Sequence, residues 1–111
     1  FFIHARDNQI LPLGGLWTEE SPGGQLCFTV MTKNPRRNLA EIHDRMPFLL
    51  AQDKLNKWID PKCFPVNPED EFSDHRTQLD YHQVSPNVNS AKYDSPDCIE
   101  KMEVQEQGEL F

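Results

Sequence analysis

The chain has 111 residues, which suits one small domain or part of one, because a chain of this size buries roughly two thirds of its unfolded surface around a single core. Charged residues make up 26% and hydrophobic residues 37%, and no apolar run approaches the roughly 20 residues that span a bilayer. This composition excludes a membrane-spanning protein. Residues 1–9 lack a basic stretch followed by an apolar one, which predicts an intracellular location, in cytoplasm, nucleoid or nucleus.

The net charge of −7 is distributed unevenly along the chain. Residues 1–68 hold eight Lys and Arg against seven Asp and Glu, whereas residues 69–111 hold three against eleven. Within residues 33–45 the basic side chains outnumber Glu41 and Asp44. These basic side chains are Lys33, Arg36, Arg37 and Arg45. A local basic cluster of this kind is typical of a nucleic-acid surface, but composition alone favours an ordinary solvated face.

The first part of the chain predicts two pairs of strands. Residues 1–5, FFIHA, and residues 10–17, ILPLGGLW, are apolar and β-prone with a polar break between them, so we expect them to pair. Residues 20–25, ESPGGQ, have the composition of a turn. Residues 26–32, LCFTVMT, alternate well enough to form a buried strand, which predicts a second hairpin.

A short helix is predicted over residues 35–42. Asn34 is suited to the N-cap position and Pro35 to the first helical position. Apolar residues then recur at helical spacing. The predicted helix would place His43 at its C-terminal end.

Residues 46–59 alternate between extended and helical patterns. Pro47 disfavours helix in the residue before it, and residues 48–50, FLL, are typical of a strand. Residues 51–59, AQDKLNKWI, predict a helix whose apolar stripe, Leu55, Trp58 and Ile59, faces the core. Trp58 is therefore assigned to the core.

The last part of the chain is mostly polar. Residues 60–80 predict a loop with one helical turn in PEDEF, and residues 81–90, YHQVSPNVNS, predict a last strand and turn. Residues 103–111 have little to bury and are expected to fray. The elements together predict an α+β fold that is mostly β, with short helices.

Residues 41–50, EIHDRMPFLL, place three ionisable side chains directly before an apolar run. The imidazole of His43 can move protons near neutral pH, and the guanidinium of Arg45 can hold a phosphate through two hydrogen bonds. A purely structural histidine is the alternative. Asp44 is better suited to a turn or a salt bridge than to catalysis.

The cysteines carry no recognisable site. Cys27, Cys63 and Cys98 are odd in number, widely spaced and without a CxxC pair, which argues against a disulfide framework or a cysteine zinc site. We expect buried, unreactive thiols.

Several short motifs occur in this chain in the order in which a known protein family has them. They are FFIH, GGLW, FTVMT, IHDRMP followed by Leu49 and Leu50, Trp58 and VSPNVN. IHDRMP is the most specific, because neither helix nor strand periodicity generates a polar triad followed by Met-Pro. On these motifs, residues 1 to about 100 resemble the C-terminal half of the SOS response-associated peptidase (SRAP) family, whose members bind abasic sites in single-stranded DNA.

The resemblance implies roles for individual residues. The histidine of the motif takes part in proton transfer and the arginine holds the DNA backbone, and these positions are His43 and Arg45. Arg36 and Arg37 are expected to add DNA contacts. The fold implied is part of a mixed β-sheet, barrel-like architecture, with residues 1–104 as the C-terminal half of the domain and 105–111 as an acidic tail. No cofactor is implied.

The family's nucleophile has no counterpart in the chain as given. SRAP proteins use the cysteine after the initiator methionine, whose thiol and α-amino group close a thiazolidine ring on the aldehyde of an abasic sugar. Residue 1 here is Phe, and Cys27 lies within a predicted strand without a free α-amino group. The chain as given is therefore expected to be inactive in crosslinking.

Three hypotheses follow for the chain. The favoured one is a fragment of an abasic-site-binding SRAP protein, whose partners are single-stranded DNA and the missing N-terminal half of the domain. The second is a truncated, non-catalytic module that pairs with itself or another chain through exposed strands. A metal site built from His4, His43, His75 and His82 lacks ligand spacing and is the least favoured.

Overall fold

The computed structural model describes residues 1–63 and 65–102. It consists of short strands in small sheets together with short helices, which confirms the predicted α+β class. The chain divides into two units, a terminal unit of Phe1–Gln9 with Gln78–Phe111 and a central unit of Ile10–Thr77. No helix in the described residues has the length and apolar character needed to cross a membrane.

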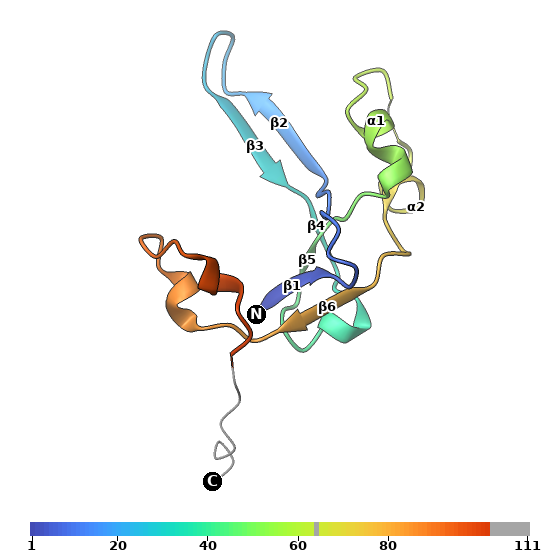
Figure 1. Ribbon diagram of the computed structural model, residues 1–111. Helices are drawn as coiled ribbons and strands as arrows, with labels where there is room; N and C mark the ends of the chain where they lie inside the picture. Colours follow the sequence, from blue (N-terminus) through green and yellow to red (C-terminus); the bar gives the residue numbers. More distant parts are fainter. Residues whose placement is uncertain (64, 103–111) are drawn as a thin grey trace. The chain divides into compact units, whose positions relative to one another are not determined.

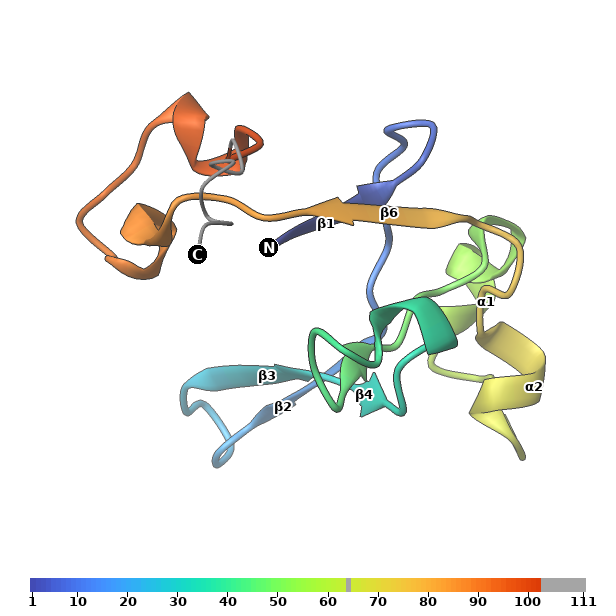
Figure 2. The same cartoon turned by 90° about the horizontal axis from the view of Figure 1, so that it is seen from below.

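The terminal unit is built on one pair of antiparallel strands. β1 (Phe2–Ala5) pairs with β6 (Leu79–His82), so that Phe2 lies opposite His82. The two strands lie side by side in Figures 1 and 2. The predicted pairing of residues 1–5 with residues 10–17 is therefore wrong, because the first strand finds its partner near the other end of the chain.

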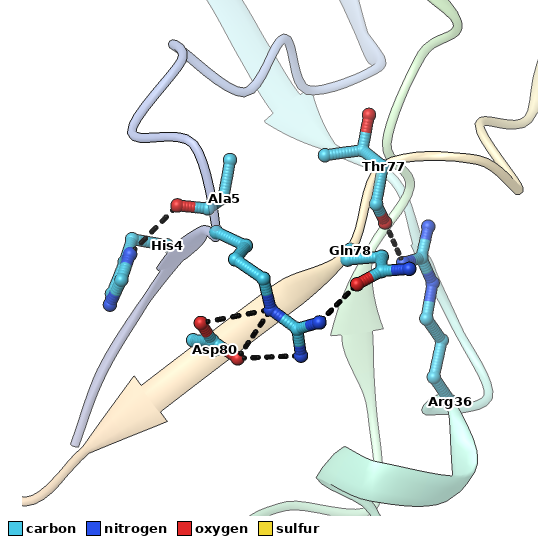
Figure 3. A network of polar contacts seen from close by, with 7 residues as sticks. His4, Ala5, Arg36, Thr77, Gln78 and Asp80 are labelled. Atoms are coloured by element: carbon cyan, nitrogen blue, oxygen red, sulfur yellow. Dashed lines mark hydrogen bonds and ion pairs between the residues drawn. The ribbon is translucent and has the colours of Figure 1, made fainter.

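Polar contacts join β1 to β6 beyond the ladder. The guanidinium of Arg6 donates to the carboxylate of Asp80, with Nη2 3.0 Å from Oδ1, and to the side chain of Gln78. Figure 3 shows Asp80 and Gln78 receiving these bonds. β6 begins within the stretch predicted as loop, since Leu79 packs inward opposite Ala5 and both side chains are buried.

Short 3₁₀ turns follow β6. η3 (Pro86–Asn89) contains most of VSPNVN, and the Ser85 hydroxyl accepts the Asn87 N–H at 3.2 Å. η4 (Pro96–Ile99) places the carbonyl of Ile99 2.7 Å from Nε2 of His82. The predicted fraying of residues 103–111 falls outside the described residues.

The central unit contains the predicted hairpin. β2 (Gly15–Glu19) pairs with β3 (Leu26–Val30), and Gly23 takes a positive φ of 75° in the turn between them, a conformation that suits glycine. Figure 1 shows this hairpin as a two-stranded ribbon. The prediction of a hairpin across residues 20–25 is confirmed.

The prediction that β3 is buried is wrong for the described residues. Trp17 and Phe28 lie opposite each other in the register and are 71% and 81% exposed, and Leu26 on the same face is 64% exposed. Alternation along the strands places these side chains on one face. The hairpin thus presents an uncovered aromatic face, which we call the hairpin face.

The core of the central unit forms around Phe48, Leu50 and Phe72. Trp58 packs against two of these rings, with centroids 5.9 Å from Phe48 and 5.2 Å from Phe72. Its indole N–H donates to the carbonyl of Gly15 at 3.2 Å, which satisfies the polar atom of a half-buried ring. The assignment of Trp58 to the core is confirmed.

The extended segments near this core form only short ladders. β4 (Thr32–Lys33) pairs with β5 (Met46–Pro47), and residues 48–50 continue from β5. Within that continuation Leu49 bridges to Leu13, and Leu50 bridges to Ser73. The strand predicted at residues 48–50 is thus present as two isolated bridges.

Two of the three predicted helical segments are present. η2 (Gln52–Lys54) and α1 (Leu55–Trp58) occupy the predicted 51–59 segment, although Ile59 is 76% exposed and does not join the apolar stripe. α2 (Pro68–Phe72) forms in PEDEF and is capped by Asn67.

The helix predicted at residues 35–42 is wrong. Only one 3₁₀ turn forms, η1 (Arg37–Leu39), preceded by Arg36 in an extended conformation. Asn34 does not cap it, because its side-chain oxygen accepts a hydrogen bond from Arg45. A nearby long-range donor thus replaces the local capping bond.

Candidate nucleic-acid interface

The IHDRMP turn is held at both ends by buried side chains. Leu39, at the end of η1, and Met46, at the start of β5, are 4% and 5% exposed. The main-chain N–H groups of Ile42 and His43 both donate to the carbonyl of Leu39, at 2.9 and 3.3 Å. Residues 43–45 therefore form a short exposed turn with fixed ends.

His43 is exposed, and its ring is bonded to its own turn. Nδ1 accepts the main-chain N–H of Arg45 at 3.0 Å and lies 3.1 Å from Oδ1 of Asp44. The side chains of His43 and Asp44 are 70% and 92% exposed. Because an amide N–H is always a donor, its bond requires an unprotonated Nδ1, whereas the ion pair requires a proton there.

The hydrogen bond from the Arg45 main-chain N–H therefore selects the neutral ring of His43 with its proton on Nε2. In that form Asp44 makes no ion pair and serves as a solvated residue of the turn. His43 is thus an exposed imidazole whose tautomer is set by the main chain of Arg45.

Arg45 is held by the segment that begins at β4. Nη1 donates to Oδ1 of Asn34 at 3.0 Å, and Nη2 donates to the main-chain oxygen of Thr32 at 2.9 Å. The hydroxyl of Thr32 also lies 3.3 Å from Nε and 3.2 Å from Nη2. The guanidinium is thus fixed at an exposed position, two residues from His43.

Arg36 and Arg37 have different surroundings. The guanidinium of Arg36 is half-buried and donates to the main-chain oxygens of Thr77 and Asp74, the latter at 2.7 Å; Figure 3 shows the contact with Thr77. Arg37 lies exposed in η1. Arg36 therefore adds positive charge while its donors hold the 74–77 turn.

The 74–77 turn is organised by one carboxylate. Oδ1 of Asp74 accepts the N–H groups of Arg76 and Thr77 at 2.8 and 3.0 Å, and Oδ2 accepts the Thr77 hydroxyl. Burial raises the pKa of Asp74, but these hydrogen bonds outweigh it and leave the pKa below its ordinary value. The turn is stable while Asp74 is ionised.

A separate hollow of about 480 Å³ lies beside this turn, lined by residues of 51–54 and 70–77. It contains four acidic side chains, from Asp53, Asp70, Glu71 and Asp74, and three basic ones, from Lys54, His75 and Arg76. Neither His43 nor Arg45 lines it. Its mixed charge favours no anionic ligand, so the site is assigned to the exposed turn and not to the hollow.

The other histidines and the cysteines suggest no second site. The rings of His4 and His82 lie 5.8 Å apart in the terminal unit, and each bonds a main-chain carbonyl. Across residues 1–63 and 65–102, no three His, Cys, Asp or Glu side chains are grouped to hold a metal ion. The three cysteines are half-buried, so the expectation of buried thiols is wrong.

The sequence did not indicate that Thr32 and Asn34 contact Arg45. The sequence assigned Asn34 to a helix cap and Thr32 to the end of a strand. Their contacts with Arg45 link positions 13 and 11 residues apart. No local pattern indicates such contacts.

Comparison with known proteins defines the class of this chain. The family model described as SOS response associated peptidase (SRAP) matches residues 1–91. The chain therefore belongs to the SRAP family, as the motifs in the sequence indicated.

Individual relatives carry related names. The chain is 29% identical over 107 residues to the abasic site processing protein YoqW of Bacillus subtilis, an alignment that covers 88% of this chain and 46% of YoqW. It is 30% identical over 111 residues to YoaM of the same organism, covering 88% and 45%. It is 27% identical over 95 residues to mouse HMCES, covering 82% and 27%. The chain thus spans a little under half the length of the two bacterial relatives and about a quarter of the length of mouse HMCES.

Proposed function

We propose that this chain takes part in binding abasic sites in single-stranded DNA through the IHDRMP turn. The observation that carries the proposal is the link between His43 and Arg45, in which the main chain of Arg45 sets the tautomer of His43 while its side chain is fixed at the surface. Membership in the SRAP family and relatives named abasic site processing proteins support it.

His43 is the proposed proton-transfer residue. The family resemblance implies that a thiol and an α-amine add to the sugar aldehyde and form a thiazolidine with loss of one water. Each addition requires protons to move between nitrogen, sulfur and oxygen. A neutral imidazole with Nε2–H available can donate one proton and accept it again, which is the work of a general acid and base.

Residues 1–111 would supply the proton-transfer and binding groups. The resemblance places the reacting cysteine directly after the initiator methionine. Covalent attachment and removal of that methionine are therefore proposed for the family protein in which such a cysteine is present.

Arg45 is the proposed phosphate contact. A guanidinium matches a phosphate geometrically, and its charge displaces counterions from the nucleic-acid backbone. Arg37 and Arg36 would add to the positive field, Arg37 from an exposed position and Arg36 from its place beside the 74–77 turn. Binding should then weaken as salt rises.

The test is a charge reversal with a matched control. Arg45→Glu and Lys57→Glu change the net charge equally, and Lys57 lies exposed in α1. In the protein as its gene encodes it, Arg45→Glu should weaken binding to single-stranded DNA with a tetrahydrofuran abasic analogue. It should also lower the salt slope by about 0.7 per lost phosphate contact. Equal loss in both variants would contradict a specific role for Arg45.

A second candidate, an interaction module, is favoured by the hairpin face. Trp17, Phe28 and Leu26 leave an aromatic surface uncovered in the described chain, and two-stranded ribbons are marginally stable alone. The partner would be a second copy or the family segment that the relatives possess beyond their match to this chain. Sedimentation of the 111-residue chain over a concentration series tests self-association. Loss of any concentration dependence in Trp17→Ser with Phe28→Ser would assign it to this face.

A further inference from the structure

The register of β4 and β5 places three side chains on one face. Thr32 pairs with Pro47 and Lys33 with Met46, so continuing the ladder by one step places Asn34 opposite Arg45. Side chains alternate along strands, and Lys33 accordingly bonds Glu69 and Ser73 on the other face, where Met46 is buried. Thr32, Asn34 and Arg45 therefore share the exposed face.

These contacts fix the guanidinium plane without using all its donors. The guanidinium has five N–H groups. Thr32 receives donors from Nε and Nη2, and Asn34 receives one from Nη1. At least one N–H of Nη1 stays available to an incoming oxygen.

A fixed arginine binds a ligand with less loss of freedom. A long exposed side chain must give up rotamer freedom when it contacts a phosphate, and that loss weakens binding. Thr32 and Asn34 impose the ordering before the ligand arrives. The same arginine donates its main-chain N–H to Nδ1 of His43.

We propose that Thr32 and Asn34 are positioning residues that hold Arg45 ready for a DNA phosphate. This inference rests on the proposed function of Arg45. Asn34→Ala removes the amide acceptor, and Thr32→Val removes the hydroxyl acceptor while the main-chain oxygen of residue 32 remains. Thr32→Ser keeps the hydroxyl. Asn56→Ala, at an exposed position of α1, is the matched control for the asparagine.

The experiment is a double-mutant cycle with Arg45→Ala, read as affinity for single-stranded DNA at two salt concentrations and as the thermal midpoint. Asn34→Ala and Thr32→Val should each weaken binding about 3- to 10-fold, a size typical of coupling between contacting residues, with an unchanged midpoint. Thr32→Ser should restore near-native affinity. In the Arg45→Ala background neither substitution should have a further effect.

The outcomes separate this inference from the function on which it rests. If Arg45→Ala leaves affinity unchanged, both the phosphate contact and the positioning role are wrong. If Arg45→Ala weakens binding while Asn34→Ala and Thr32→Val do not, only the positioning role is wrong. Equal losses with and without Arg45 would also overturn it, because Thr32 and Asn34 would then act independently of Arg45.

Discussion

The guanidinium of Arg36 donates to the main-chain oxygens of Thr77 and Asp74, so a basic residue beside the candidate site is also a structural link across the central unit. Its neighbour Arg37 has the same charge and is exposed. Comparing substitutions of Arg36 and Arg37 therefore separates the effect of losing a positive charge from the effect of losing hydrogen bonds that hold the fold.

Arg36→Ala should destabilise the central unit. Two half-buried carbonyl groups lose charged donors, which typically costs about 1–3 kcal/mol of unfolding free energy. Arg37→Ala should change it by less than about 0.5 kcal/mol, as at most exposed positions. Urea unfolding of both variants measures the difference, and equal midpoints would contradict the structural role of Arg36.

Glu69 should make stability depend on acid pH. The hydrogen bond from Lys33 holds the pKa of Glu69 below its ordinary value of 4.5, so the ionised form stabilises the fold above that value. This contribution is lost as the pH falls through the lowered pKa. Glu69→Gln should therefore lower the thermal midpoint at pH 7 and make little difference at the lowest pH at which the chain folds.

The exposed Glu41 supplies the control for this pH dependence. Glu41→Gln removes the same charge without removing a bond to Lys33, and it should leave the midpoint nearly unchanged at pH 7. If the thermal midpoint of Glu69→Gln falls with decreasing pH as steeply as that of the unsubstituted chain, the acid-sensitive stabilisation does not come from the Glu69–Lys33 pair.

His43→Gln should separate chemistry from folding. Glutamine keeps a hydrogen-bond acceptor at an exposed position, so the thermal midpoint should change little. In the protein as its gene encodes it, the rate of adduct formation or release should fall by about 10²- to 10⁴-fold, as when a positioned acid or base is lost. Single-turnover crosslinking to abasic DNA measures this rate.

His75→Gln is the matched control, since His75 is also exposed in the central unit. It should leave both rate and midpoint unchanged. A lowered midpoint with normal kinetics in His43→Gln would instead make His43 a structural residue.

A polypeptide prepared to start at Phe1 and end at Phe111 should form no stable adduct with abasic single-stranded DNA. The α-amine of Phe1 can form a reversible imine with an aldehyde, but without a thiol on the same residue it cannot close a thiazolidine ring. Denaturing electrophoresis without a reductant should show only free protein. A band that survives denaturation without borohydride would identify another nucleophile.

Local patterns predicted the elements whose partners lie close in sequence. The ESPGGQ turn predicted the β2–β3 hairpin, and Asn67 with Pro68 marks the start of α2 by the usual capping chemistry. Trp58 was assigned to the core from helical spacing alone. Each of these features depends on residues that lie close together in the sequence.

Contacts between residues far apart in the sequence explain the predictions that were wrong. Asn34 has the chemistry of a helix cap, but Arg45 lies across a short ladder and uses the same oxygen. The first strand has no local partner and pairs with β6. The family resemblance carried by IHDRMP indicated His43 and Arg45 as candidate residues, whereas the contacts of Thr32 and Asn34 with Arg45 form only in the folded chain.

The pairing of β1 with β6 has a consequence for how the chain is made. During synthesis FFIHA leaves the ribosome before residues 79–82 do, so His82 must follow before Phe2 has its partner. At usual elongation rates this wait lasts about 4 to 15 seconds, far longer than a hairpin such as β2–β3 takes to close. The nascent chain therefore carries an unpaired aromatic strand while residues 6–78 are made. Chaperones that hold extended apolar segments could bind that strand before β6 is available to it.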